Sequence, residues 1–252
     1  MGYTDYHVHT DWSYCCKAEG NYKLEDLIRL MPERNVENFV VTDHSSHFYF
    51  EEQDAWQFRY IEDPRLFQLV KKEGNQRVKA YIKNIRSFRN KGVRVGMEVD
   101  IALDGTWILD KSYRDELEVI IGAVHWLPCL KKGGDLERLK KEFLAQTLLI
   151  LETGIDILAH PTRIFRQQGF SVPEEIIDPI IEKAISYGVA LELNGHSRDP
   201  DEIFIKRCLE KGAKIVWGTD CHRLEEFGNF DFHRTILRKA KVLLYKGKRE
   251  KG

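Results

Sequence analysis

Seven short apolar runs recur along the chain, and longer segments with the spacing of amphipathic helices separate them. Strands that alternate with helices form βαβ units and therefore a parallel sheet. Seven such units without an obvious linker predict a closed α/β barrel, with an open doubly wound sheet as the alternative. We expect strands at residues 3–9, 36–44, 93–101, 118–126, 154–161, 187–195 and 213–222.

Helical spacing is clearest at residues 23–34, 136–154 and 171–188. The last two segments end at Gly154 and Gly188, and glycine often follows the last turn of a helix because it adopts left-handed backbone angles without strain. These glycines therefore predict where two of the helices stop.

The longest excursion between strands covers residues 45–92. It begins with an aromatic-rich stretch and continues as a predicted long helix to about Asn90. Long loops at the carboxyl ends of strands often cover a site, so the aromatic residues could form a lid. Packing on the outer helices is the alternative for Phe48, Tyr49, Phe50 and Trp56.

The composition is that of a globular chain, with 42% hydrophobic and 31% charged residues. The 252 residues suit a single domain, with a core of about 3–245 and a basic tail at 246–252. Lys and Arg (39) nearly balance Asp and Glu (40), which argues against a non-specific nucleic-acid binder. We expect neither a membrane span nor a signal peptide, because no long apolar run or leader pattern is present. Five irregularly spaced cysteines predict free thiols and a cytoplasmic protein.

Histidines and carboxylates fall at the ends of nearly all the predicted strands. The carboxyl ends of parallel strands meet on one face, where the catalytic groups of α/β folds gather. A single such histidine is more often a hydrogen-bonded core residue, but many together are costly to bury unless they are paired or bind metal ions. Histidine and carboxylate without a CxxC pair favour an open Zn, Mn or Fe site over a structural zinc. The residues are His7, His9, Asp43, His44, Glu98, Asp100, His125, His160, Asp220 and His222.

Six of these strand-end segments occur in a recognisable order. "YHVHT", "VTDHS", "GMEVDI", "GAVHW", "ILAHP" and "GTDCH" resemble the successive motifs of the polymerase and histidinol phosphatase (PHP) superfamily. Within it, "GMEVDI", "VHW" and "GTDCHRLEEFG" resemble the stand-alone histidinol-phosphate phosphatases most. The resemblance implies a distorted (β/α)7 barrel with two or three divalent metal ions. It also implies hydrolysis of a phosphate monoester, typically of L-histidinol phosphate to L-histidinol and phosphate in histidine biosynthesis.

The resemblance also implies how the ligands divide. His7, His9 and Asp220 would hold the first metal, Glu98 would bridge it to a second, His125 and His160 would complete the second, and His44 and His222 would belong to a third. Two neighbouring cations can share a hydroxide, lower its pKa and neutralise charge on a phosphoryl group. The catalytic candidates are Glu98, Asp220 and His222, and Asp220 could in addition protonate the leaving alkoxide.

Other polar residues are candidates for contacts with the substrate or the ligands. Arg163 and Arg198 are expected at the barrel mouth as phosphate clamps, with solvated surface arginines as the alternative. His196 and Trp126 could contact the substrate, or they could be a loop histidine and a core side chain. Asp43 is expected to accept from a histidine and fix its orientation, and Asp100 to do the same or to cap a turn.

The chain departs from the family pattern after His9. A further ligand, commonly histidine, is expected about eight residues after the first histidine, and that count reaches Cys15. Either Cys15 or its neighbour Cys16 binds the third metal as a thiolate, which would favour Zn over Mn, or the third site is weak. Ordinary free cysteines in a loop are the remaining interpretation.

The leading functional hypothesis is a metal-dependent phosphomonoesterase with a small phosphorylated substrate, most specifically a histidinol phosphatase. PHP enzymes acting on nucleotides, oligonucleotide ends or phosphotyrosine are alternatives. A non-catalytic, metal-poor module is a further one, although such a module could replace the histidines with apolar residues. The sequence does not indicate the oligomeric state.

Overall fold

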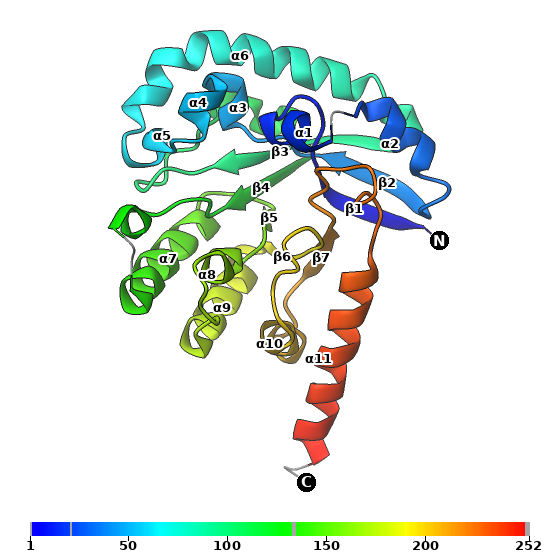
Figure 1. Ribbon diagram of the computed structural model, residues 1–252, viewed down its shortest axis with the longest axis vertical. Coiled ribbons are helices and arrows are strands. Elements are labelled where there is room, and N and C mark those ends of the chain that lie inside the picture. Colours follow the sequence, from blue (N-terminus) through cyan, green and yellow to red (C-terminus); the bar gives the residue numbers. More distant parts are fainter. Residues whose placement is uncertain (1, 21, 133–134, 250–252) are drawn as a thin grey trace.

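The computed structural model describes residues 2–20, 22–132 and 135–249 and contains the barrel that the sequence predicts. Within these residues, seven parallel strands pair in chain order, and helices surround them (Figure 1). The strands are β1 (Tyr3–Val8), β2 (Val36–Val41), β3 (Val93–Asp100), β4 (Val119–Ala123), β5 (Ile157–Leu158), β6 (Ala190–Asn194) and β7 (Ile215–Gly218).

The helices lie between and after these strands. The α-helices are α1 (Tyr14–Glu19), α2 (Leu24–Leu30), α3 (Ser46–Tyr49), α4 (Glu52–Ala55), α5 (Arg59–Glu62), α6 (Arg65–Arg86), α7 (Leu136–Leu151), α8 (Arg163–Gln167), α9 (Ile177–Tyr187), α10 (Glu202–Lys211) and α11 (Asp231–Arg249). The 3-10 helices are η1 (Arg89–Lys91), η2 (Lys111–Glu116), η3 (Pro128–Lys132) and η4 (Glu174–Ile176).

The strands are shorter than predicted, and this places the polar side chains on loops. Every residue of β4 and β6 is buried, as expected for parallel strands covered on both faces. β5 has only two residues and ends before His160. The apolar runs therefore predicted the strands correctly, while most of the candidate ligands lie just beyond the strand ends.

The barrel closes between its first and last strands through a few backbone and side-chain contacts. Val8 and Cys221 form a parallel bridge, and the backbone N–H of Asp220 donates to the carbonyl of His7 at 2.7 Å. The buried carboxylate of Asp5 accepts from the backbone N–H and the hydroxyl of Thr219, at 2.8 and 2.5 Å. The barrel is thus nearly closed, as the family resemblance implies.

The excursion after β2 contains the expected long helix, α6, which ends at Arg86 rather than at about Asn90. Three short helices, α3 to α5, precede α6, which runs along one side of the barrel (Figure 1). Gly74 of α6 lets this helix approach α3, because a Cβ there would overlap the ring of Tyr49. Phe48, Tyr49 and Phe50 are buried in the core, whereas Trp56 is 43% exposed. Most of the aromatic stretch therefore packs, and only Trp56 is open to solvent.

Two helix ends and the tail can be compared with their predictions. α9 ends at Gly188 with a φ of 72°, as predicted, but α7 ends at Leu151, before Gly154. α11 continues to Arg249, so residues 246–249 of the expected basic tail are helical, and residues 250–252 lie outside the described part. Figure 1 shows α11 extending away from the barrel.

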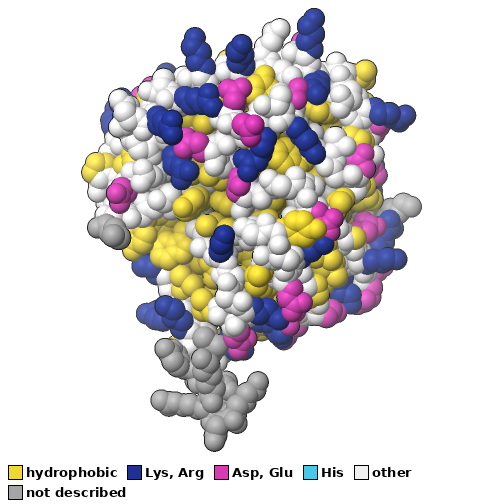
Figure 2. Space-filling model, turned by 180° about the vertical axis from the view of Figure 1, so that it is seen from behind, with side chains coloured by type: hydrophobic (Ala, Val, Ile, Leu, Met, Phe, Trp, Pro, Cys, Tyr) yellow, Lys and Arg dark blue, Asp and Glu magenta, His cyan; other side chains and the backbone are white. Residues whose placement is uncertain are grey.

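The histidines of the cluster do not reach the surface on the side opposite to the view of Figure 1. Figure 2 shows apolar side chains in patches between Lys, Arg, Asp and Glu, and no described histidine is visible there. No helix among the described residues is both long and apolar enough to cross a membrane. All five cysteines are buried, and none of them forms a disulfide bond, as predicted.

Candidate metal centre

Glu98, on β3, lies between two groups of imidazoles. Its Oε1 is 3.1 Å from Nε2 of His160 and 3.2 Å from Nε2 of His125. Its Oε2 is 2.9 Å from Nδ1 of His44 and 3.4 Å from Nε2 of His7. One buried carboxylate therefore contacts side chains that come from the ends of four other strands.

The first and last strands supply a second set of close contacts. Nε2 of His7 and Nε2 of His9 are 3.2 Å apart, because residues two apart on a strand share a face. Oδ1 of Asp220 lies 3.0 Å from Nε2 of His9 and 3.4 Å from Nε2 of His7. The structure thus brings together the three residues that the resemblance assigns to the first metal.

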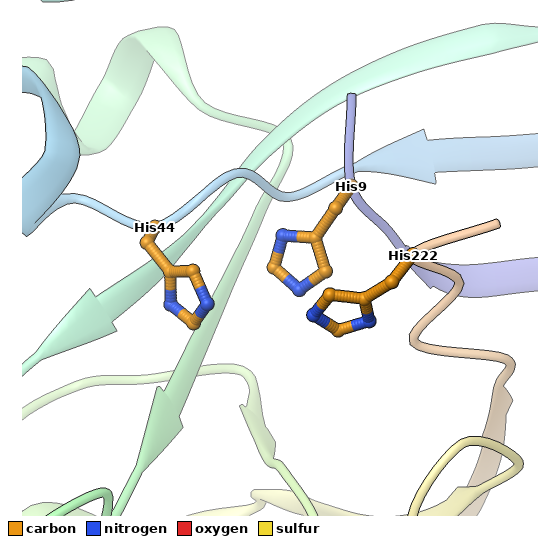
Figure 3. Close-up of side chains that lie close together, drawn as sticks. All are labelled: His9, His44 and His222. Atoms are coloured by element: carbon orange, nitrogen blue, oxygen red, sulfur yellow. The ribbon is translucent and has the colours of Figure 1, made fainter. Parts of the chain in front are cut away.

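Three imidazoles form a further group near the barrel mouth. His9, His44 and His222 have ligand atoms within 4.8 Å of one another, and Figure 3 shows their rings gathered around a common space. Nδ1 of His222 donates to the carbonyl of Asp220 at 2.7 Å, which leaves Nε2 as its free acceptor. His9 thus lies between the first group and this one.

One of the two buried aspartates beside the histidines forms a hydrogen bond with a ring, and the other does not. Oδ1 of Asp100 is 2.7 Å from Nδ1 of His125, which places Asp100 as an orienting residue rather than a turn cap. Asp43 lies 3.9 Å from Nδ1 of His9, too far for a hydrogen bond. It accepts instead from the backbone N–H and hydroxyl of Thr10, at 2.8 and 2.7 Å. Asp43 therefore fixes the loop after His9 rather than a histidine ring.

Burial and charge set the protonation of these groups. Burial raises the pKa of Glu98, but His44, His125 and His7 outweigh it and hold the pKa well below its usual value. The pKa of Asp220 is likewise held well below its usual value, since His7 and His9 outweigh its burial. An ionised Asp220 suits a ligand and disfavours the role of proton donor.

The histidines respond in opposite directions. Burial and the nearby Arg163 lower the pKa of His160 to about 3, so its imidazole is neutral. Burial lowers the pKa of His125 as well, but Glu98 and Asp100 outweigh it and raise the pKa to about 9. A cation would therefore compete with a proton at His125 but not at His160.

The cluster has the properties of a site for divalent cations. Oε2 of Glu98, Nε2 of His125 and Nδ1 of His9 are buried, and their contacts with the described residues do not have hydrogen-bond geometry. Unpartnered buried polar atoms are costly unless something else binds them. Imidazole nitrogens with carboxylate oxygens are ligands for Zn, Mn or Fe, so the residues present fit the metal ions that the family implies.

A cavity of about 310 Å³ opens beside the cluster. Arg163 lines it, and the buried Nε of Arg163 has no hydrogen-bond partner among the described residues. Cys15 also lines it, but no group of three or more candidate ligands in the described chain contains this thiol. The other lining residues are His44, Ser46, His47, Trp56, Phe58, Asp100, His125, Gln167 and His222.

The remaining predicted substrate contacts do not line this cavity, although the ring centre of His196 is 4.4 Å from that of His222. Arg198 and His196 line a separate cavity of about 300 Å³, where Nδ1 of His196 is 3.0 Å from Oε1 of Glu226. Trp126 is partly buried against the core, with the ammonium group of Lys131 5.1 Å from the ring centre. The cavity at the cluster is walled by Trp56 and not by Trp126.

Sequence reasoning missed two residues of the site. Glu192 is the charged residue in the fully buried β6, and this was the signal that could have revealed it. His47 lines the cavity, and its Nδ1 accepts from the backbone N–H of Tyr14 at 3.1 Å. The proton of the neutral His47 ring is therefore on Nε2. No strand pattern marks this residue in the sequence.

Comparisons with known proteins agree with this geometry. The PHP domain family matches residues 5–196. DNA polymerase/3'-5' exonuclease PolX of Bacillus subtilis is 24% identical over 240 residues, which are 94% of this chain but 37% of the relative. A protein named probable phosphatase, from Thermoanaerobacter sp., is 25% identical over 175 residues, 64% of this chain and 67% of the relative.

Two solved structures share the fold. A candidate histidinol phosphatase of Listeria monocytogenes has a TM-score of 0.67 at 14% identity, over 90% of this chain and 97% of that one. A histidinol phosphate phosphatase of Lactococcus lactis, complexed with Zn, L-histidinol and phosphate, has a TM-score of 0.56 at 17% identity, over 94% and 93%. Since the family match runs from β1 through β6 and contains five of the six strand-end motifs, this chain belongs to the PHP domain family.

Proposed function

We propose that this protein is a metal-dependent phosphatase that hydrolyses small phosphate monoesters, with L-histidinol phosphate as its substrate. The observation that carries the proposal is the position of Glu98, whose two oxygens lie 2.9–3.4 Å from nitrogens of four histidines. Bound divalent cations would supply Lewis acidity toward the phosphoryl oxygens and an acidified water as nucleophile.

The residues of the chain divide into those that hold the cations and those that hold the substrate. His7, His9 and Asp220 would form one position, and His125 and His160 a second, with Glu98 shared between them. His44 and His222 would contribute to a third position, beside His9.

Arg163 is the best-placed group for the phosphate. It lines the cavity at the cluster, and a guanidinium group binds phosphate oxygens through two parallel hydrogen bonds. Phe58 and Trp56 give the same cavity an apolar wall for the organic part of the substrate. Arg198 and His196 remain predicted substrate contacts that would require the substrate to extend toward the neighbouring cavity.

A second candidate function is hydrolysis at the end of an oligonucleotide. The match with PolX over 94% of this chain favours it. The near-neutral charge of the chain, −1 at pH 7, gives it no general attraction for a polyanion. We therefore place it second.

Phosphate release from a panel of substrates tests the proposal. The purified protein, loaded with Zn or Mn, would be given histidinol phosphate, nucleoside monophosphates, short oligonucleotides and phosphotyrosine. We expect kcat/KM for histidinol phosphate to exceed the others by about 100-fold or more, which corresponds to roughly 2.7 kcal/mol of transition-state discrimination. Equal low rates would remove the substrate assignment alone, whereas no release from any substrate would overturn the phosphatase.

A further inference from the structure

We propose that Glu192 is a positioning residue that serves two neighbouring cation positions with one carboxylate. The inference rests on the proposed function only in taking His7 and His160 as metal ligands. Glu192 lies in the middle of β6 and is 1% exposed. A carboxylate this deeply buried is costly unless its oxygens accept several hydrogen bonds.

The two oxygens of Glu192 contact different ligands. Oε1 lies 2.8 Å from Nδ1 of His7, and Oε2 accepts from the backbone N–H of His160 at 2.7 Å. Because a carboxylate only accepts, Nδ1 of His7 carries the proton in this contact. The lone pair of His7 is then on Nε2, which is 3.2 Å from Nε2 of His9 and 3.4 Å from Oε2 of Glu98. Glu192 therefore selects the ring form that can bind a cation on the side of the cluster.

The contact with His160 acts on the backbone. His160 has a φ of 28°, in the left-handed region that residues with a side chain adopt rarely. The hydrogen bond from its N–H to Glu192 helps to hold this conformation. The conformation in turn sets the position of the Cβ from which the imidazole extends. One carboxylate thus orients a ring at the first position and a backbone at the second.

Asn194 extends this network to a third ligand. Its Nδ2 donates to Oε2 of Glu192 and to Oδ2 of Asp220, both at 3.0 Å. Asp220 also has a positive φ, of 54°. The ends of β1, β5 and β7 are therefore connected through two side chains of β6.

The chain leaves room for this carboxylate. At Gly218, the last residue of β7, a Cβ would overlap Oε1 of Glu192 and would lie 2.6 Å from Cβ of His7. The glycine of "GTDCH" is therefore required for close packing of Glu192 against His7. Its φ is not positive, so conformational freedom is not the reason for a glycine at this position.

The test compares Zn affinity in wild type, Glu192→Gln and Glu192→Asp. A chromophoric chelator would compete for Zn with each metal-loaded protein, and released Zn would be counted per chain. Gln keeps the shape but loses the charge and one acceptor, while Asp keeps the charge but is one methylene shorter. We expect both variants to bind the two tightest ions about 10- to 100-fold more weakly, as is usual when a partner of a metal ligand is removed.

Asp156→Asn is the matched control. Asp156 directly precedes β5, at the strand end opposite to His160, and its carboxylate accepts from the backbone N–H of Ile120 at 2.7 Å. We expect its Zn affinity to stay within about twofold of wild type. Circular dichroism would show whether each variant is folded. If Glu192→Gln does not fold, Glu192→Asp still provides the test.

The outcomes separate this inference from the proposed function. Tight Zn binding by wild type with unchanged affinity in both Glu192 variants would overturn the role of Glu192 and leave the proposed function standing. Weakening of one ion alone would overturn the claim that the carboxylate serves two positions. A wild type that binds no transition metal would overturn both.

Discussion

Cys15 lines the cavity together with His44 and His222, the two histidines that the family resemblance assigns to a third cation. Burial raises the pKa of its thiol, and the negative charges of Asp43 and Asp220 raise it further. A thiolate would therefore form only if a bound cation compensated for this environment. In the described chain it is His9 that completes a group of three ligands with these histidines.

We expect Cys15→Ala to keep the metal content of wild type, because three imidazoles remain around the third position. Metal per chain, measured by mass spectrometry after purification in Zn- or Mn-containing medium, checks this. Cys16→Ala is the control, since Cys16 is buried in the same helix and does not line the cavity. Loss of one ion per chain from Cys15→Ala alone would make Cys15 a ligand.

At the scale of the elements, the same aspartate–threonine hydrogen-bond pair occurs at three strand ends. In each case a buried aspartate accepts from both the backbone N–H and the hydroxyl of a threonine that follows or precedes a candidate ligand by one or two residues. Each pair fixes a loop whose backbone positions that ligand. The pairs are Asp5 with Thr219, Asp43 with Thr10, and Asp199 with Thr162.

We expect Asp199→Asn to change how stability depends on pH. Burial raises the pKa of Asp199 from 3.8 to about 6, although its bonds to Thr162 lower it. The folded state then holds the proton more tightly than the unfolded state, so the stability contributed by Asp199 falls as pH rises from about 4 to 6. The fall is at most roughly 3 kcal/mol.

Urea unfolding of wild type and Asp199→Asn between pH 4 and 7 measures this effect. Chelator in both samples makes metal loss equal. The difference in unfolding free energy should favour wild type most at pH 4 and shrink toward pH 7. A difference that does not vary with pH would show that the carboxyl group titrates alike in both states.

The elements also show how far the sequence could predict the site. Apolar runs predicted the strands, and histidines at their ends predicted the candidate ligands, because both depend on patterns along the chain. Asp43 was expected to contact a histidine and instead contacts Thr10, because which donor meets a carboxylate depends on the exact course of two loops. Glu192 and His47 were missed for the same reason: their partners are distant in sequence. Arg198 and His196 share the loop after β6, and both line a cavity that is separate from the cavity at the cluster.

At the scale of the whole molecule, the cluster joins the first and the last strand of the barrel. His9 follows β1 and Asp220 follows β7, 211 residues further along the chain, and their side chains are 3.0 Å apart. The same seam contains one bridge, the hydrogen bond from the N–H of Asp220 to the carbonyl of His7, and the contacts of Asp5. A cation bound by both residues would therefore stabilise the closed barrel as well as the site.

We expect Zn or Mn to raise the unfolding temperature. Free metal at 100 times its dissociation constant stabilises the folded state by about 2.7 kcal/mol per site, which for a chain of this size is roughly 5–10 °C. Thermal unfolding followed by circular dichroism, with and without metal, measures the shift. His7→Ala should lose most of it. His233→Ala should keep it, because the Nε2 of His233 donates to the backbone carbonyls of Leu193 and Gly218, outside the cluster, so that its removal lowers stability with and without metal alike. An equal shift in wild type and His7→Ala would place the stabilising cation away from the seam.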